Sequence, residues 1–155
     1  MNKTHLFIIR GISGAGKSTL ASTLASKGRD ISADDFMHEV VGDRTTPYTF
    51  DGDKLEASHE WCEAKVKELL TDGTGLPVVV ANTFTCRWEM ESYISFCKEN
   101  SILFTVCDLY DGGCSDEQLA ERNAHGVPVE GIQRMRGRYE HDWRTANPVK
   151  PWLRG

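Results

Sequence analysis

The clearest chemical signal lies near the start of the chain, in the segment GISGAGKS at residues 11–18. It matches the pattern GxxxxGK[S/T] in full, between an apolar stretch and a helix-forming stretch. Glycines let the backbone curl so that successive N–H groups face phosphate oxygens, and the helix N-terminus adds partial positive charge. The pattern therefore predicts a phosphate-binding loop (P-loop) rather than a glycine-rich turn without a ligand.

Two side chains of this loop carry the expected chemistry. We expect Lys17 to reach the β- and γ-phosphates of ATP and the Ser18 hydroxyl to ligate Mg²⁺. The residues expected to bind the nucleotide are Gly11, Ser13, Gly14, Ala15, Gly16, Lys17, Ser18 and Thr19.

An acidic pair, Asp34 and Asp35, follows a short stretch expected to be a strand. In open α/β sheets the carboxyl ends of the strands line the ligand crevice. We expect Asp34 to accept the proton of an attacking hydroxyl and, together with Ser18, to help hold the metal. Asp35 is the alternate base and a candidate for substrate binding. The competing interpretation is that one of the pair caps the following helix.

Asn82 and Thr83 come directly after the apolar run at residues 76–81. They are candidates for orienting the acceptor or a phosphate oxygen, although Asn and Thr suit a turn equally well. Arg87, a few residues later, is a candidate ligand for an acceptor phosphate. Many P-loop enzymes have an Asp at this strand end, where this chain has Ala81. The metal must then depend on Ser18, the acidic pair, water and the nucleotide.

A lid is expected at about residues 115–137. Within it, Arg122 is a candidate for neutralising charge in the transition state, and His125, beside a glycine, for reaching phosphate. For either residue alone, a surface salt bridge is an open alternative.

Strand and helix patterns alternate along the chain, which predicts an α/β P-loop kinase fold with a central parallel sheet and helices on both faces. Apolar residues on both sides of the last two strands predict that both are buried. The expected strands are 5–10, 29–33, 76–81 and 102–109, and the expected helices are 17–27, 53–70, 88–98, 115–122 and 130–139. Residues 40–53 read as a loop, and residues 143–155 as an irregular basic tail.

The helix predicted at 53–70 has an apolar stripe, which we expect to be its buried face, with His59 packed on it. The stripe consists of Leu55, His59, Cys62, Val66 and Leu69. Four aromatic side chains, Trp61, Trp88, Tyr93 and Phe96, are likewise expected in the core.

With 155 residues, the chain is expected to be one domain over 1–155. Its net charge of −5 argues against non-specific coating of nucleic acid. Residues 132–155 carry a net charge of +4 and the rest of the chain a net charge of −9. The basic C-terminal end either contacts an anionic substrate or is simply solvated. No stretch suits a signal peptide or a membrane span, and the five scattered cysteines suit free thiols, so a cytoplasmic location is expected. Whether the chain forms a homo-oligomer stays open.

Taken together, these segments resemble the P-loop polynucleotide 5′-hydroxyl kinase family, in its phage-type branch. The matching stretches are RGISGAGKSTLA, ISADDF, YTFDGDKLEASHEWC, VVVANTFTCRWEM and AERNAHGVPVEGIQRMRGRYE, in that order. The resemblance implies transfer of the γ-phosphate of ATP to the 5′-hydroxyl end of DNA or RNA, as in nucleic acid end repair. It implies that Lys17 and Ser18 bind phosphate and metal, that Asp34 deprotonates the 5′-hydroxyl, and that Arg122 belongs to the lid.

The chain also departs from the family pattern at the acceptor side. The Arg expected three residues after the base, which contacts the acceptor's phosphate, is replaced by Met37. The family's second lid Arg has no counterpart near His125, and the 155 residues are too few to be expected to hold the 3′-phosphatase module that often accompanies the kinase. Three alternatives therefore stay open: a kinase of a small-molecule, nucleoside or modified-base hydroxyl, a plain NTPase, and a non-catalytic ATP-binding switch module.

Overall fold

The computed structural model describes residues 4–26, 28–36 and 52–153, with the backbone alone for 52–54. Four strands form one sheet in the order β2-β3-β1-β4, and every pairing is parallel. The strands are β1 (His5–Gly11), β2 (Asp30–Ile31), β3 (Val78–Asn82) and β4 (Leu103–Tyr110). This confirms the predicted fold class. Met37 and most of the loop expected at 40–53 lie outside the described residues.

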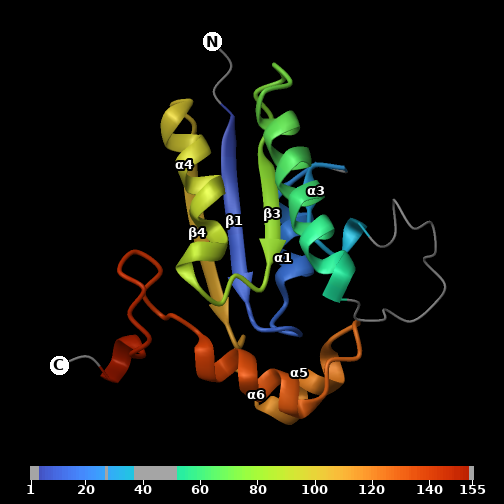
Figure 1. Cartoon of the computed structure of the whole chain (residues 1–155), viewed down its shortest axis with the longest axis vertical. Coiled ribbons are helices and arrows are strands. Elements are labelled where there is room, and N and C mark those ends of the chain that lie inside the picture. Colours follow the sequence, from blue (N-terminus) through green and yellow to red (C-terminus); the bar gives the residue numbers. More distant parts are fainter. Residues whose placement is uncertain (1–3, 27, 37–51, 154–155) are drawn as a thin grey trace.

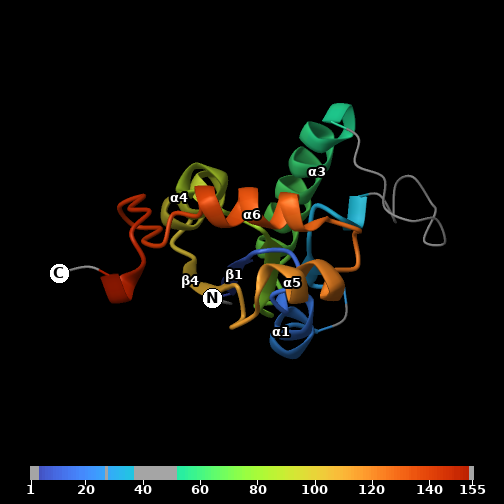
Figure 2. The ribbon, with the colours of Figure 1, turned by 90° about the horizontal axis from the view of Figure 1, so that it is seen from below.

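Helices cover both faces of the sheet and the end at which its strands finish (Figure 1). Helix α1 packs on one face, whereas α3 and α4 pack on the other. Helices α5 and α6 cross the carboxyl ends of the strands, as the view from below shows (Figure 2). The helices are α1 (Lys17–Leu24), α3 (Gly52–Leu70), α4 (Glu91–Glu99), α5 (Asp116–Arg122) and α6 (Val129–Arg138), with 3-10 turns η1 (Arg87–Met90) and η2 (Pro151–Leu153). Among the described helices, none is both long and apolar enough to cross a bilayer.

The two inner strands are buried on both sides, as predicted for the run that became β3. In β1, Leu6 and Ile8 join the core under α3 and α4, whereas Ile9 joins the core under α1. Every residue of β3 is buried. These strands therefore form a rigid platform whose ends position the residues that follow them.

The prediction that the last strand is buried is wrong. Strand β4 pairs with β1 at the edge of the sheet, and its residues are half-buried or exposed, with Leu103 64% exposed. Its apolar run resembles that of β3, but burial depends on whether a neighbour covers each side. Composition alone does not contain that information.

The predicted buried stripe of α3 is partly wrong. Cys62 and Val66 are buried, but Leu55 and His59 are exposed, and Ser58 is buried in their place. The expected packing of His59 is therefore not found. The reason is that this end of α3 borders a cavity instead of the sheet.

Among the aromatic residues expected in the core, Tyr93 is buried, and Trp61 and Phe96 pack against the core. Trp88, in contrast, is 76% exposed. The predicted helix over 88–98 is divided into the turn η1 and helix α4. Because the two segments differ in helical geometry, the spacing that would bury Trp88 in one continuous helix does not apply.

A completely buried arginine, Arg10, links the end of β1 to three other segments. Its Nη1 lies 3.2 Å from Oδ2 of Asp108 on β4, and its guanidinium stacks 4.2 Å from the Tyr139 ring centre. The guanidinium also donates to three backbone carbonyls, those of Phe84, Thr85 and Glu140. Arg10 thereby ties β1 to β4, to the segment after β3 and to the end of α6.

Candidate functional site

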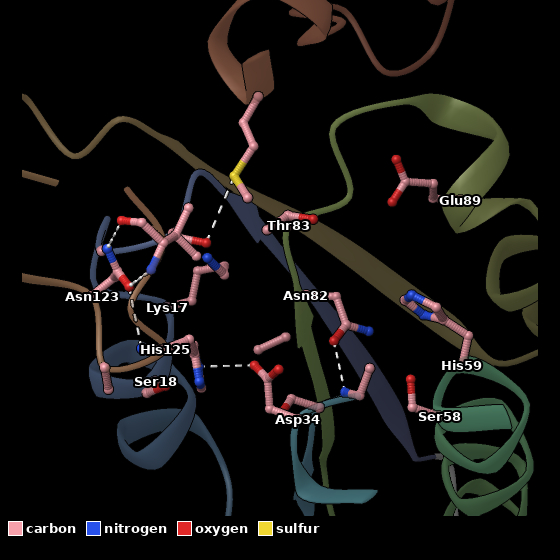
Figure 3. A pocket seen from close by; sticks show the side chains of 18 of the residues that line it. Lys17, Ser18, Asp34, Ser58, His59, Asn82, Thr83, Glu89, Asn123 and His125 are labelled. Atoms are coloured by element: carbon pink, nitrogen blue, oxygen red, sulfur yellow. Dashed lines mark hydrogen bonds and ion pairs between the residues drawn. The ribbon is translucent and has the colours of Figure 1, made fainter. Parts of the chain in front are cut away.

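A cavity of about 740 Å³ opens at the carboxyl ends of the strands. The P-loop borders it on one side and the start of α3 on the other, as Figure 3 shows with Lys17 and Ser18 facing Ser58 and His59. Its remaining borders are 32–34, 81–83, η1, the segment 122–127 and α6. Parallel strands end at one edge of a sheet, which explains why segments so far apart in sequence meet here.

The P-loop takes the conformation that its glycines allow. Gly14 and Gly16 have φ values of 89° and 101°, in the left-handed region that favours glycine. A Cβ added to Gly14 would lie only 2.6 Å from the carbonyl oxygen of Leu119 in α5. Gly16 precedes α1, whose N-terminus has no side-chain cap. The first N–H groups of α1 are thus left for an anion.

Lys17 lies folded over this loop. Its Nζ donates to the carbonyl oxygens of Gly11 at 2.8 Å and Ile12 at 3.2 Å. Burial lowers the pKa of Lys17 to about 8, although the nearby Asp34 carboxylate opposes this shift. The ammonium group is therefore poorly hydrated, and an anion entering the loop would interact with it strongly.

The predicted nucleotide-binding residues divide into two groups. Ser13, Gly14, Gly16, Lys17, Ser18 and Thr19 border the cavity. Gly11 and Ala15 are buried behind it, where Gly11 accepts the Lys17 hydrogen bond and Ala15 packs with Leu119 of the lid. These two residues shape the loop and offer the cavity no side chain.

Asp34 borders the same cavity and faces the lid. Its Oδ2 lies 3.0 Å from Nε2 of His125, an ion pair when the imidazole is protonated. The hydrogen bond to Asp34 raises the pKa of His125, while burial and the Lys17 charge oppose the rise. Lys17, Asp34 and His125 thus form one charged cluster, which Figure 3 shows at the P-loop side.

The second aspartate has a different place. Asp35 is not among the cavity-lining residues, and its Oδ2 accepts from the backbone N–H of Ser32 at 2.8 Å. It closes the turn that presents Asp34, which fits the alternative of one structural Asp in the pair. A role for Asp35 as base or substrate ligand finds no support in this position.

Asn82 and Thr83 both reach the cavity, but differently. Asn82 is buried, and its Oδ1 accepts from the backbone N–H of Ala33 at 2.8 Å. It therefore fixes the segment that carries Asp34. Thr83 is half-buried and borders the cavity with its side chain.

The two arginines predicted as site residues lie in different places. Arg122 borders the cavity from the end of α5, and its Nη1 donates to Sγ of Cys114 at 2.8 Å. Arg87 does not border the cavity. Its Nη1 donates to the carbonyls of Trp143 and Arg144, and its Nε pairs with Glu91. The guanidinium of Arg87 is thus held by the returning C-terminal segment, and the expected contact of Arg87 with an acceptor phosphate stays a prediction that this placement does not favour.

Sequence reasoning missed Asn123, which holds the lid loop. Its Nδ2 donates to the carbonyls of Leu119, Ala120 and Val127, and its Oδ1 accepts from the N–H groups of His125 and Val127. An Asn directly after a helix, followed by a His-Gly turn, was the available signal. Two further cavity residues, Trp88 and Arg138, were also missed as site residues.

The donors around the P-loop suit a hard cation. The Ser18 hydroxyl and the Asp34 carboxylate both border the cavity, and oxygen ligands of this kind are those that Mg²⁺ prefers. Within the described residues there is no group of three or more His, Cys, Asp or Glu that could hold a metal ion. Any Mg²⁺ here would thus depend on nucleotide oxygens as well.

Comparisons with known proteins agree with this geometry. The chain is 34% identical over 140 residues to NEDD4-binding protein 2 of Homo sapiens, covering 87% of this chain but only 8% of that protein. It resembles a chain of the Pnkp1/Rnl/Hen1 RNA repair complex (TM-score 0.65, 18% identity, all of this chain and 50% of that one). It also resembles the Mycobacterium tuberculosis APS kinase CysC bound to AMPPNP and APS (TM-score 0.50, 14% identity, 70% of this chain and 64% of that one).

The two structural likenesses, both under 20% identity, establish the fold of P-loop kinases and nothing finer. The family comparison goes further, because the AAA_33 model, described as an AAA domain, matches residues 6–141. Together with the P-loop, the lysine within it and the parallel sheet behind it, this match means that the chain belongs to that family of P-loop, kinase-like domains.

Proposed function

We propose that this chain is an ATP-dependent kinase that transfers the γ-phosphoryl group to the 5′-hydroxyl end of a polynucleotide. The observation that carries the proposal is the cavity itself, which joins the P-loop lysine, Lys17, to a carboxylate, Asp34. Beyond Asp34 the same cavity extends to α3 and η1, where an acceptor has room. The sequence motifs favour a polynucleotide 5′ end as that acceptor.

Each group has a defined part in the transfer. Asp34 accepts the proton of the 5′-hydroxyl as its oxygen bonds to the γ-phosphorus, and the bond from this phosphorus to the β–γ bridging oxygen breaks, so that ADP leaves. Lys17 neutralises charge on the phosphate oxygens, and Arg122, at the lid, approaches from the other side. Ser18 and Asp34 would hold Mg²⁺, which supplies charge neutralisation at the phosphates.

The lid, expected at about 115–137, corresponds to α5, the Asn123 loop and most of α6. Nε2 of its His125 lies 3.0 Å from Oδ2 of Asp34. The acceptor hydroxyl must approach the same carboxylate, so His125 has to turn away from it or share it. We propose that His125 then contacts a phosphate oxygen.

The structural likenesses do not select the acceptor, because one comes from an RNA repair complex and the other from a kinase of APS. The deciding experiment is transfer of label from γ-labelled ATP, with Mg²⁺, to short DNA and RNA strands with a 5′-hydroxyl. Nucleosides and simple alcohols serve as competing acceptors. We expect labelled 5′ ends with the intact protein and a loss of more than about 100-fold in Asp34→Asn.

Asp30→Asn is the matched control, since Asp30 lies on the same segment but does not border the cavity. ATP binding should survive in both variants. Strands that stay unlabelled while nucleosides are labelled would disprove the polynucleotide acceptor. Full activity of Asp34→Asn would disprove the proposed base.

A further inference from the structure

We infer that Trp88 and Arg138 form a subsite for the first nucleotide of the acceptor. The Trp88 indole stacks on the 5′-terminal base, and the Arg138 guanidinium binds the phosphate on the 3′ side of that nucleotide. This inference rests on the proposed function, because it requires a polynucleotide as acceptor. Both residues border the cavity and connect to Glu89, which Figure 3 shows across from Lys17 and Ser18.

The turn that carries Trp88 is held firmly, although its indole is 76% exposed. Oε1 of Glu89 accepts from the backbone N–H of Cys86 at 3.2 Å, which caps η1. The backbone N–H of Arg87 donates to Oε1 of Glu140 at 2.6 Å, and Met90 is completely buried. The backbone of η1 thus holds an exposed indole at the border of the cavity, and exposed aromatic rings of this kind are the platforms on which single-stranded nucleic acids stack their bases.

Arg138 lies beside this turn, anchored by only one edge of its guanidinium. Its Nε donates to Oγ1 of Thr85 at 3.1 Å, and Oγ1 of Thr85 in turn donates to Glu89 at 2.9 Å. In the part of the chain that the structure describes, the terminal nitrogens of Arg138 have no hydrogen-bond partner. These two nitrogens are therefore available for the fork-like contact that a guanidinium makes with phosphate.

Glu89 also borders the cavity and would repel a phosphate if its charge were unopposed. Its Oε1 accepts two hydrogen bonds, from Thr85 and from the N–H of Cys86, which stabilise the charge within η1. Arg138 adds a positive charge to the same cluster. A phosphate that binds the terminal nitrogens of Arg138 would therefore meet a cation first.

An aromatic ring and an anchored guanidinium that border one cavity match a base linked to a phosphate better than they match a small alcohol. Stacking is tolerant of base identity, since each base has a π-face. We therefore expect little preference among the four bases at the 5′ end.

The test compares Trp88→Ala, Trp88→Phe and Arg138→Ala with two control variants. Trp152→Ala removes another exposed indole, in η2, and Arg134→Ala removes another exposed arginine, in α6; neither residue borders the cavity. For each protein, kcat and KM are measured for a 5′-hydroxyl oligonucleotide, a nucleoside 3′-monophosphate and the bare nucleoside, and KM for ATP is measured alongside.

We expect Trp88→Ala to raise the oligonucleotide KM about five- to a hundredfold, with Trp88→Phe restoring part of the loss and the ATP KM unchanged. Arg138→Ala should raise KM for both phosphate-bearing acceptors but not for the bare nucleoside. Because both effects concern KM of one substrate, a general loss of folded protein would not reproduce them.

Fluorescence gives a second measurement that needs no turnover. Titration with a 5′-hydroxyl oligonucleotide without ATP should quench the tryptophan emission of the intact protein and of Trp152→Ala, but far less that of Trp88→Phe. Equal KM values and equal quenching in all variants would overturn the subsite while leaving the kinase in place. An intact protein that labels no oligonucleotide would instead overturn the proposed function, and the subsite with it.

Discussion

At the scale of single residues, the buried amine of Lys17 makes the stability of the protein change with pH in the alkaline range. Burial lowers its pKa to about 8, compared with an ordinary 10.5. Between these two values the unfolded chain keeps the proton that the folded chain has lost, so the free energy of unfolding rises with pH. The shift corresponds to about 3 kcal/mol. Lys17→Met should remove this rise and abolish phosphoryl transfer.

The measurement is urea unfolding, followed by tryptophan fluorescence, in steps from pH 7 to 10.5. The informative quantity is the difference between the intact protein and Lys17→Met, because other groups that titrate in this range are common to both. Two parallel curves would show that Lys17 has an ordinary pKa.

The ion pair between His125 and Asp34 predicts that the free energy of unfolding changes with pH in the opposite direction. Because the pKa of His125 is raised by its hydrogen bond to Asp34, the folded state holds the proton more tightly than the unfolded state. The stabilisation is present below about pH 6.5 and is lost as the pH rises through the folded pKa. Relative to His125→Asn, the intact protein should therefore lose stability above pH 6.5.

Urea unfolding at pH 5.5 to 8.5 tests this, with His59→Asn as the control because His59 is exposed on α3. The effect is expected to be small, since both side chains of the pair are partly solvated. A stability difference that is constant over this range would exclude the pair in solution.

At the scale of elements, Gly14 joins the P-loop to α5. A Cβ there would meet the Leu119 carbonyl oxygen at 2.6 Å, and φ is +89°. We expect Gly14→Ala to displace α5, to destabilise the protein by about 2 kcal/mol or more and to weaken ATP binding. Thermal unfolding and ATP titration measure the two effects.

Gly73→Ala is the matched control, because Gly73 has a similar φ of +83° with nothing within 4 Å of an added Cβ. It should show the backbone cost of about 1 kcal/mol alone, with unchanged ATP binding. If both variants behave alike, the contact between the loop and α5 has no energetic weight.

Arg10 joins β1 to β4 and to the segments that flank η1, as Gly14 joins the P-loop to α5. Replacing Arg10 by Met removes the guanidinium donor from Oδ2 of Asp108 and from three backbone carbonyls, in a part-buried setting. We expect Arg10→Met to cost about 3–5 kcal/mol in the free energy of unfolding. Asp108→Asn should cost less, because its amide can still pair with Tyr139 or Arg10. Chemical denaturation of both variants gives the comparison, and equal losses would mean that the carbonyl contacts are unimportant.

The elements also show what the sequence could and could not predict. The P-loop was predictable because its glycines, lysine and flanking strand and helix are contiguous in the chain. The edge position of β4 was not, since its apolar run resembles that of β3 and only the strand order separates them. The sequence also did not show that Arg138, and not Arg87, borders the cavity. Arg87 is occupied by carbonyls of residues 143 and 144, more than fifty positions away in the sequence.

At the scale of the whole molecule, the net charge of −5 limits how nucleic acid can bind. Among the described residues, the positively charged side chains that border the cavity are, apart from histidines, Lys17, Arg122 and Arg138. We therefore expect the acceptor to use one or two phosphate contacts, with log(1/KM) falling against log[salt] with a slope of about −0.7 to −1.4. Lengthening the strand beyond a few nucleotides should bring little further gain.

This is measured with 5′-hydroxyl strands of two to twelve nucleotides at 50 to 300 mM KCl, with ATP saturating. Arg138→Ala should make the slope shallower by about 0.7, whereas Arg134→Ala should leave it unchanged. A slope steeper than about −3 would indicate a wide basic contact surface, which would then involve the basic C-terminal end.

The strand order has a consequence for how the protein forms. Strand β1 is the first to leave the ribosome, yet its neighbours in the sheet, β3 and β4, are synthesised much later. The buried guanidinium of Arg10 donates to carbonyl groups that lie 74 and 130 positions further along the chain. Because such distant contacts must close large loops first, folding is expected to be slow for a domain of this size. The P-loop, which follows β1 directly, therefore reaches its final surroundings only when the end of α6 has been made.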